Sequence, residues 1–116
     1  MSIYKAYTDV SIKKGRAIHS YCIFDKDDNF IKGKVLKSEL KGSTQGEEYS
    51  IQTLVKDLEG EKIESLQIFT DHLGLRLQKE RKIHEEIRKL RGELIWVPRC
   101  KNKLADKACK SGNEDF

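Results

Sequence analysis

Three strand-like segments stand in a row at the start of the chain, and they constrain its fold more than any other feature. Segments 3–12 and 17–25 are rich in Tyr, Ile, Val, Thr and Phe, and a short turn containing Gly15 separates them. The polar residues 26–29 form a second turn before a third segment, 30–40. Because short polar turns join antiparallel strands, this part predicts a three-stranded antiparallel sheet.

After these segments the hydrophobic period changes from that of a strand to that of a helix. Ile51, Leu54, Val55 and Leu58 occupy positions i, i+3, i+4 and i+7, which share one face of an α-helix. Gly60 is suited to end this helix, since glycine is favoured just after a helical C-terminus.

The second half of the chain alternates between the two periods. Segment 66–71 reads as a short buried strand, 73–91 as a charged helical region, 93–99 as a fifth strand and 102–110 as a terminal helix. Strands that are joined through helical crossovers lie parallel in their sheet. We therefore predict an α/β fold of order βββαβαβα, in which three antiparallel strands and then parallel strands form a mixed five-stranded sheet with flanking helices.

Length and composition indicate one globular domain. The chain has 116 residues, of which 37% are hydrophobic and 36% charged, so we expect one domain over 1–112 and a flexible tail over 113–116. No apolar run is long enough to span a bilayer and no secretory signal is visible, which favours a cytoplasmic monomer. The net charge of +4 permits nucleic-acid binding without requiring it.

The three cysteines do not indicate a zinc site or a disulfide. Cys22, Cys100 and Cys109 are far apart or lack the C-x-x-C spacing of metal ligands. We expect free, reduced thiols.

Four acidic residues occupy unusual positions in the predicted elements. Asp9 interrupts the first strand, Glu48 opens the first helix, Asp71 ends the fourth strand and Asp106 lies in the first turn of the last helix. Each alone could be a turn or cap residue. Together, clustered carboxylates need positive charge among them. Two divalent ions provide that charge and suit phosphoryl chemistry, and all-oxygen ligands favour Mg²⁺ or Mn²⁺ over zinc.

The segments that carry these acids resemble, in order, the four motifs of the ribonuclease H family, in the type 1-like form. The matching segments are Tyr7-Thr8-Asp9, Gly46-Glu47-Glu48-Tyr49, Ile68-Phe69-Thr70-Asp71 and Trp96-Val97-Pro98-Arg99 followed by Asn102, Ala105-Asp106 and Ala108. The resemblance covers residues 3–110 and implies the ribonuclease H-like fold. It also implies a metal-dependent endonuclease that hydrolyses the RNA strand of RNA–DNA hybrids with two Mg²⁺ or Mn²⁺ ions.

The resemblance also implies roles for individual residues. Asp9 would bridge both ions, Asp106 would complete the site that activates water, and Glu48 and Asp71 would complete the site at the leaving 3′ oxygen. Glu48 is preferred to Glu47 because the family's glutamate precedes an aromatic or aliphatic residue, as Glu48 precedes Tyr49. For substrate binding, the resemblance implies Thr44, Gln45 and Gly46 along the hybrid's minor groove. Asn102 could assist there or cap its own helix.

The match departs from the family at several positions. Val10 stands where the family usually has glycine, and Arg99-Cys100-Lys101 replaces a histidine-bearing loop. The basic protrusion is also missing, so this is a short form with lower expected turnover. His72 could lie near the metals, whereas His84 is expected to be solvated.

Other classes of function stay open. The same fold could serve as a catalytically weak or inert nucleic-acid-binding module, or as a related DNA nuclease. A small regulatory domain is a third reading, but it leaves the acid inside the first strand unexplained.

Overall fold

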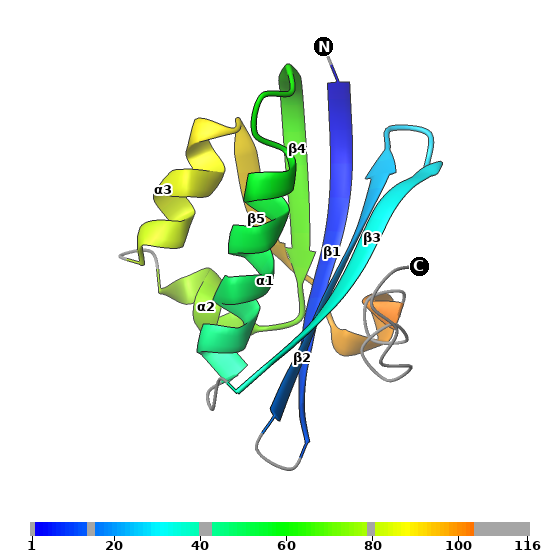
Figure 1. The fold of residues 1–116 in the computed structure, drawn as a ribbon. Coiled ribbons are helices and arrows are strands. Elements are labelled where there is room, and N and C mark those ends of the chain that lie inside the picture. The colour runs from blue at the N-terminus through cyan, green and yellow to red at the C-terminus, as the bar shows by residue number, and fades with distance from the viewer. Residues whose placement is uncertain (1, 14–15, 40–42, 79–80, 104–116) are drawn as a thin grey trace.

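The computed structural model describes residues 2–13, 16–39, 43–78 and 81–103. Three strands come first, and helices and strands then follow one another, with two successive helices before the last strand (Figure 1). The elements are β1 (Ser2–Lys13), β2 (Arg16–Asp25), β3 (Phe30–Ser38), α1 (Ser43–Asp57), β4 (Ile63–Thr70), α2 (Leu73–Leu77), α3 (Lys82–Lys89), β5 (Gly92–Trp96) and a short 3₁₀ helix, η1 (Arg99–Lys101).

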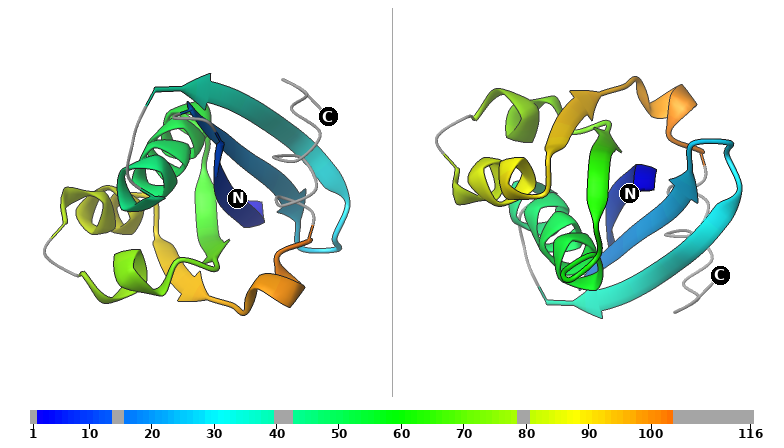
Figure 2. Two further views of the ribbon diagram at one scale, coloured as in Figure 1. Left: turned by 90° about the horizontal axis from the view of Figure 1, so that it is seen from below. Right: turned by 90° about the horizontal axis from the view of Figure 1, so that it is seen from above.

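The five strands form one mixed sheet of order β3-β2-β1-β4-β5. β2 pairs antiparallel with both β1 and β3, whereas β4 pairs parallel with both β1 and β5. Helices α1, α2 and α3 lie on one face of this sheet (Figure 2). The predicted α/β class and the mixed five-stranded sheet are therefore confirmed.

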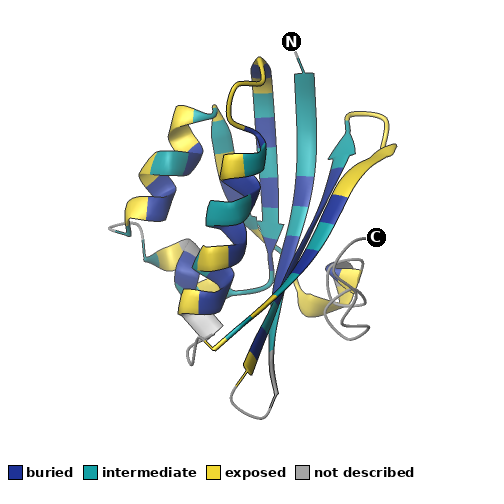
Figure 3. Cartoon of the chain, in the orientation of Figure 1, coloured by how far each residue is buried: buried dark blue, intermediate teal, exposed yellow. Residues whose placement is uncertain are grey.

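The core lies between this helical layer and the sheet. The predicted stripe on α1 faces inward, and Ile51 and Leu54 are fully buried. They pack with Ala6 and Ile68 of the two central strands and with Ile87 of α3. Figure 3 shows buried segments facing the sheet and exposed ones facing solvent on both α1 and α3. Removal of this apolar surface from water is the main stabilising contribution.

The charged region 73–91 differs from its prediction, because it forms two helices rather than one. Nδ1 of His72 accepts a hydrogen bond from the Leu75 amide at 2.9 Å and so caps α2. His84 of α3 is buried, and its Nε2 donates to the Leu75 carbonyl at 2.8 Å. The expectation that His84 is solvated was wrong: the amphipathic α3 turns this histidine inward, where it ties α3 to α2.

The C-terminal elements are only partly described. β5 ends at Trp96, and a 3₁₀ turn follows where the predicted strand continued. Residues 104–110 of the predicted last helix and the predicted tail 113–116 lie outside the described residues. In the described part, Cys22 and Cys100 are free thiols, and no helix there is long and apolar enough to cross a membrane.

We predict that Leu54→Ala destabilises the protein by about 2–5 kcal/mol, because it removes a fully buried side chain and leaves a cavity in the core. Leu77→Ala is the matched control, since Leu77 is 64% exposed, and it should change stability by less than about 0.5 kcal/mol. Urea denaturation of both variants measures the difference. Equal losses would contradict the placement of the core.

Candidate metal centre

Three carboxylates converge where β1, β4 and the N-terminal half of α1 meet. One oxygen from each of Asp9, Glu47 and Asp71 lies within 4.8 Å of the other two. Asp9 is 2% exposed, Glu47 is fully buried, and the side chain of Asp71 is 8% exposed. Such a cluster of buried acids is costly for a protein unless positive charge joins it.

The sheet register brings the two aspartates together. Thr8 of β1 is the partner of Thr70 in the parallel pair with β4. The next residue on each strand is an aspartate, Asp9 and Asp71, so both carboxylates come to the same point of the sheet. Repetition of Thr-Asp on two neighbouring parallel strands therefore produces a pair of acids.

Glu47 joins the pair from α1 because it belongs to the buried stripe of that helix. It lies four residues before Ile51 and seven before Leu54, so the three side chains share one face. The core side chains that hold α1 against β1 and β2 therefore favour, in the body of the helix, the rotation that turns Glu47 toward the two aspartates.

The surroundings of Glu47 favour its protonated form in the metal-free protein. Burial raises the pKa of Glu47 from 4.5 to about 7, and hydrogen bonds from the hydroxyls of Thr8 and Thr70 oppose this rise. The negative charge of Asp71 raises the same pKa further. Oε2 of Glu47 is buried and has no hydrogen-bond partner among the described residues.

Asn102 joins the two strands at the site. Its Nδ2 donates to the Thr8 carbonyl at 2.7 Å and lies 3.4 Å from Oδ2 of Asp71. The side chain is fully buried, and Oδ1 lacks a partner in the described part of the chain. Arg99 also approaches Asp71, with Nε 3.7 Å from Oδ2, but it is 78% exposed and contributes little.

The donor set fits a hard divalent cation. Mg²⁺ prefers oxygen ligands at about 2.0–2.1 Å in octahedral geometry, and carboxylates are its usual protein ligands. Small movements would bring the oxygens of Asp9, Glu47 and Asp71 to one ion, and the unpartnered Oε2 of Glu47 offers a further donor. Bound positive charge would also offset the mutual repulsion of the three acids.

The structure favours Glu47 over its neighbour Glu48, the residue predicted from the sequence, as the member of the carboxylate cluster. Glu48 lies outside the carboxylate cluster, and its Oε2 is 2.7 Å from Nε of Arg81. The prediction relied on the aromatic Tyr49 that follows Glu48 and overlooked the helical stripe. Neighbours on a helix differ by about 100° in direction, so a stripe through Ile51 and Leu54 includes Glu47 and excludes Glu48.

The remaining predicted residues divide into three groups. Asp106 lies outside the described residues. Thr44 and Gln45 lie in the first turn of α1, and Gln45 is exposed. Gly46 is buried against Val10, and Asn102 contacts Asp71. Sequence reasoning missed Thr8 and Thr70 as hydrogen-bond donors to Glu47, although each directly precedes one of the predicted aspartates.

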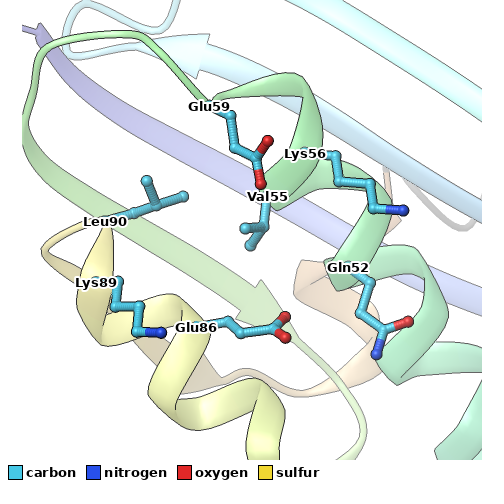
Figure 4. A pocket seen from close by; sticks show the side chains of 7 residues that line it. All are labelled: Gln52, Val55, Lys56, Glu59, Glu86, Lys89 and Leu90. Atoms are coloured by element: carbon cyan, nitrogen blue, oxygen red, sulfur yellow. The ribbon is translucent and has the colours of Figure 1, made fainter.

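A separate groove lies between the C-terminal half of α1 and α3. Figure 4 shows its lining residues, Gln52, Val55, Lys56, Glu59, Glu86, Lys89 and Leu90. Its volume is about 530 Å³. It shares no residue with the carboxylate cluster and carries equal numbers of acids and lysines, so it has no net charge to select a charged ligand.

We predict that, in the absence of metal, the wild type loses stability relative to the Glu47→Gln variant as the pH rises from about 5 to about 8. Protonation of Glu47 stabilises the folded state fully below pH 4.5, and this contribution is lost as the pH passes about 7. The variant should therefore gain up to roughly 3 kcal/mol over the wild type at the upper end. Urea denaturation with a chelator at several pH values measures this gain. The control is Glu59→Gln, at an exposed position, whose stability should depend on pH as that of the wild type does. If the stability of Glu47→Gln also changed with pH in parallel with the wild type, the burial of Glu47 would be contradicted.

Comparison with known proteins identifies the fold. No protein-family model and no curated protein matches this chain. Among solved structures, LC11 ribonuclease H1 isolated from compost matches with a TM-score of 0.77 and 18% identity, over 97% of this chain and 96% of that chain.

Two further structures agree. The ribonuclease H domain of a Mycobacterium tuberculosis protein matches with a TM-score of 0.75 and 14% identity, over 97% of this chain and 94% of that chain. LC11 ribonuclease H1 in complex with an RNA/DNA hybrid matches with a TM-score of 0.70 and 18% identity, over 90% and 91%. This chain therefore has the ribonuclease H fold.

Proposed function

We propose that this protein is a ribonuclease H, a divalent-metal-dependent endonuclease that hydrolyses the RNA strand of RNA–DNA hybrids. The convergence of Asp9, Glu47 and Asp71 on this fold is the observation that carries the proposal. Solved structures of the same fold are ribonucleases H1, and one is a complex with an RNA/DNA hybrid. A purely structural domain would have no reason to bury three carboxylates within 4.8 Å of one another.

In this proposal Asp9, Glu47, Asp71 and Asp106 hold two Mg²⁺ or Mn²⁺ ions. Asp106, which lies outside the described residues, is included because its segment resembles the family's last motif. Bound divalent ions supply Lewis acidity at the phosphodiester and a water molecule of lowered pKa.

The residues of the chain position these reacting groups. Asp9 comes from β1, the central strand of the sheet, and would be one of the residues that hold the ions. Thr8 and Thr70 donate hydrogen bonds to Glu47 and orient it, while Asn102 holds Asp71 relative to β1. The reaction then joins a water oxygen to phosphorus and releases the 3′ oxygen, which leaves with a proton from solvent.

The hybrid would approach the first turn of α1. In this proposal Gln45, which is exposed, would contact the minor groove together with Thr44 and Gly46, since 2′-hydroxyls there distinguish RNA from DNA. Asn102 is fully buried, so in this proposal it acts on the hybrid only indirectly, by positioning Asp71.

We predict that Asp9→Asn lowers the cleavage rate of a labelled RNA–DNA hybrid by at least about 100-fold, because one of the metal-binding charges is lost. The variant should stay folded and should be at least as stable as the wild type without metal, since one of three repelling charges is removed. A gel assay with and without Mg²⁺ or Mn²⁺ measures the rate, and a thermal melt measures folding. Undiminished cleavage by Asp9→Asn would refute the site, and an inactive wild type would favour the inert binding module.

We predict that Glu47→Gln reduces cleavage far more than Glu48→Gln, which should reduce it by no more than about tenfold, the lower end of the range for loss of an outer partner. The reason is that Glu47 faces Asp9 and Asp71, whereas Glu48 pairs with Arg81. Rates of both variants on the same hybrid decide the order. The opposite ranking would place Glu48 in the metal site and contradict the orientation of α1.

A further inference from the structure

We propose that a first-turn clamp, consisting of His19, Val10 and Arg81, rotates the start of α1 so that Glu47 rather than Glu48 faces the carboxylate cluster. These three would be positioning residues, since none of them belongs to the cluster. Only the expected effect on metal binding rests on the proposed function. The contacts themselves can be tested in the metal-free protein.

A clamp is needed because the core fixes the body of α1 more firmly than its beginning. Ile51 and Leu54 are fully buried and set the rotation from the second turn onward. The first turn frays more easily, since its amides lack helical partners, and Gly46 adds backbone freedom there. Glu47 and Glu48 follow this turn directly. If the turn changed its helical rotation, Glu48 instead of Glu47 would face Asp9 and Asp71.

His19 and Val10 hold the residue before Glu47. Nδ1 of His19 donates to the Gly46 carbonyl at 2.8 Å, so Nε2 accepts from the Ser38 hydroxyl. A Cβ on Gly46 would lie 2.6 Å from Cγ2 of Val10 and 3.2 Å from Cε1 of His19. Only glycine therefore allows this approach, and the buried His19 connects α1 to β2 and β3.

Arg81 holds the residue after Glu47. Its Nε is 2.7 Å from Oε2 of Glu48, and its Nη1 donates to Oε1 of Gln78 at 3.0 Å. Both partners of the ion pair are partly buried, at 30% and 22% exposure. Arg81 directly precedes α3, so the pair draws Glu48 toward that helix and away from the three acids.

Tyr49 completes the set of contacts around Glu47. Its ring lies 4.9 Å from the ring of His19. Residues 46, 48 and 49 are thus each held by a residue outside α1, while Glu47 itself is bound by Thr8. An ordinary surface ion pair at Arg81 would contribute little to stability and nothing to the orientation of a neighbouring residue.

The test compares Arg81→Gln, Glu48→Gln and the double variant with Arg88→Gln, the same substitution at an exposed position of α3. Amide hydrogen exchange of residues 49–51 in the metal-free protein measures the first turn. Calorimetric titration with Mn²⁺ measures binding. Each single variant should show about two- to fivefold faster exchange and about two- to fivefold weaker Mn²⁺ binding. The double variant should show no faster exchange and no weaker Mn²⁺ binding than either single variant, because each substitution removes the same ion pair.

Several outcomes would overturn the clamp. If Arg81→Gln and Glu48→Gln both exchanged amide hydrogens at the rate of Arg88→Gln, the ion pair would not hold the first turn of α1. If the effects of the two substitutions added up in the double variant, Arg81 and Glu48 would act separately. Loss of Mn²⁺ binding in Glu48→Gln alone, to the level of Glu47→Gln, would make Glu48 a ligand. A wild type that binds no Mn²⁺ would refute the proposed function instead, and hydrogen exchange would then decide on the clamp by itself.

Discussion

The mutual repulsion of Asp9, Glu47 and Asp71 is the constraint on which the arrangement of the site depends. Three acids with oxygens within 4.8 Å of one another cannot all be charged and buried without compensation. Burial of the apolar stripe of α1 against β1 and β2 offsets part of this cost. The metal-free protein relieves the remainder by favouring a proton on Glu47, whose pKa is raised by burial.

Short hydrogen-bonded connections keep the acids in place despite this repulsion. Thr8 is central to them, because its hydroxyl donates to Glu47 and its carbonyl accepts from Asn102. Asn102 in turn contacts Asp71. One residue of the central strand therefore links all the elements that supply the site, and rigid elements of this kind give a metal site its geometry.

The fold could be predicted from the sequence because its signals are local. The change between strand and helix periods yields most of the order of the elements, and crossover rules then predict that the later strands lie parallel in the sheet. That β4 pairs with β1 is seen only in the structure. The grouping of Asp9 and Asp71 could be predicted as well, because each occupies an unusual position for an acid on its strand. The sequence motif favoured Glu48, whereas the cluster contains Glu47; a local signal for Glu47 was present, since Ile51 and Leu54 already defined the stripe that contains it.

Other features could not be predicted, because they join residues that are distant in sequence. The bond from Asn102 to Thr8 spans 94 positions and that from Thr8 to Glu47 spans 39. The pairing of Glu48 with Arg81 and the break between α2 and α3 likewise depend on tertiary packing. No pattern within one element indicates such contacts, and helix propensity yields to packing in these cases.

The position of Val10 shows how such a distant contact changes the meaning of a single residue. In the sequence, a valine where the family usually has glycine would crowd the approach of the backbone to the RNA. In the structure its Cγ2 occupies the space that a side chain at Gly46 would need. Val10 on β1 thus requires a residue without a side chain on α1, and Gly46 provides it.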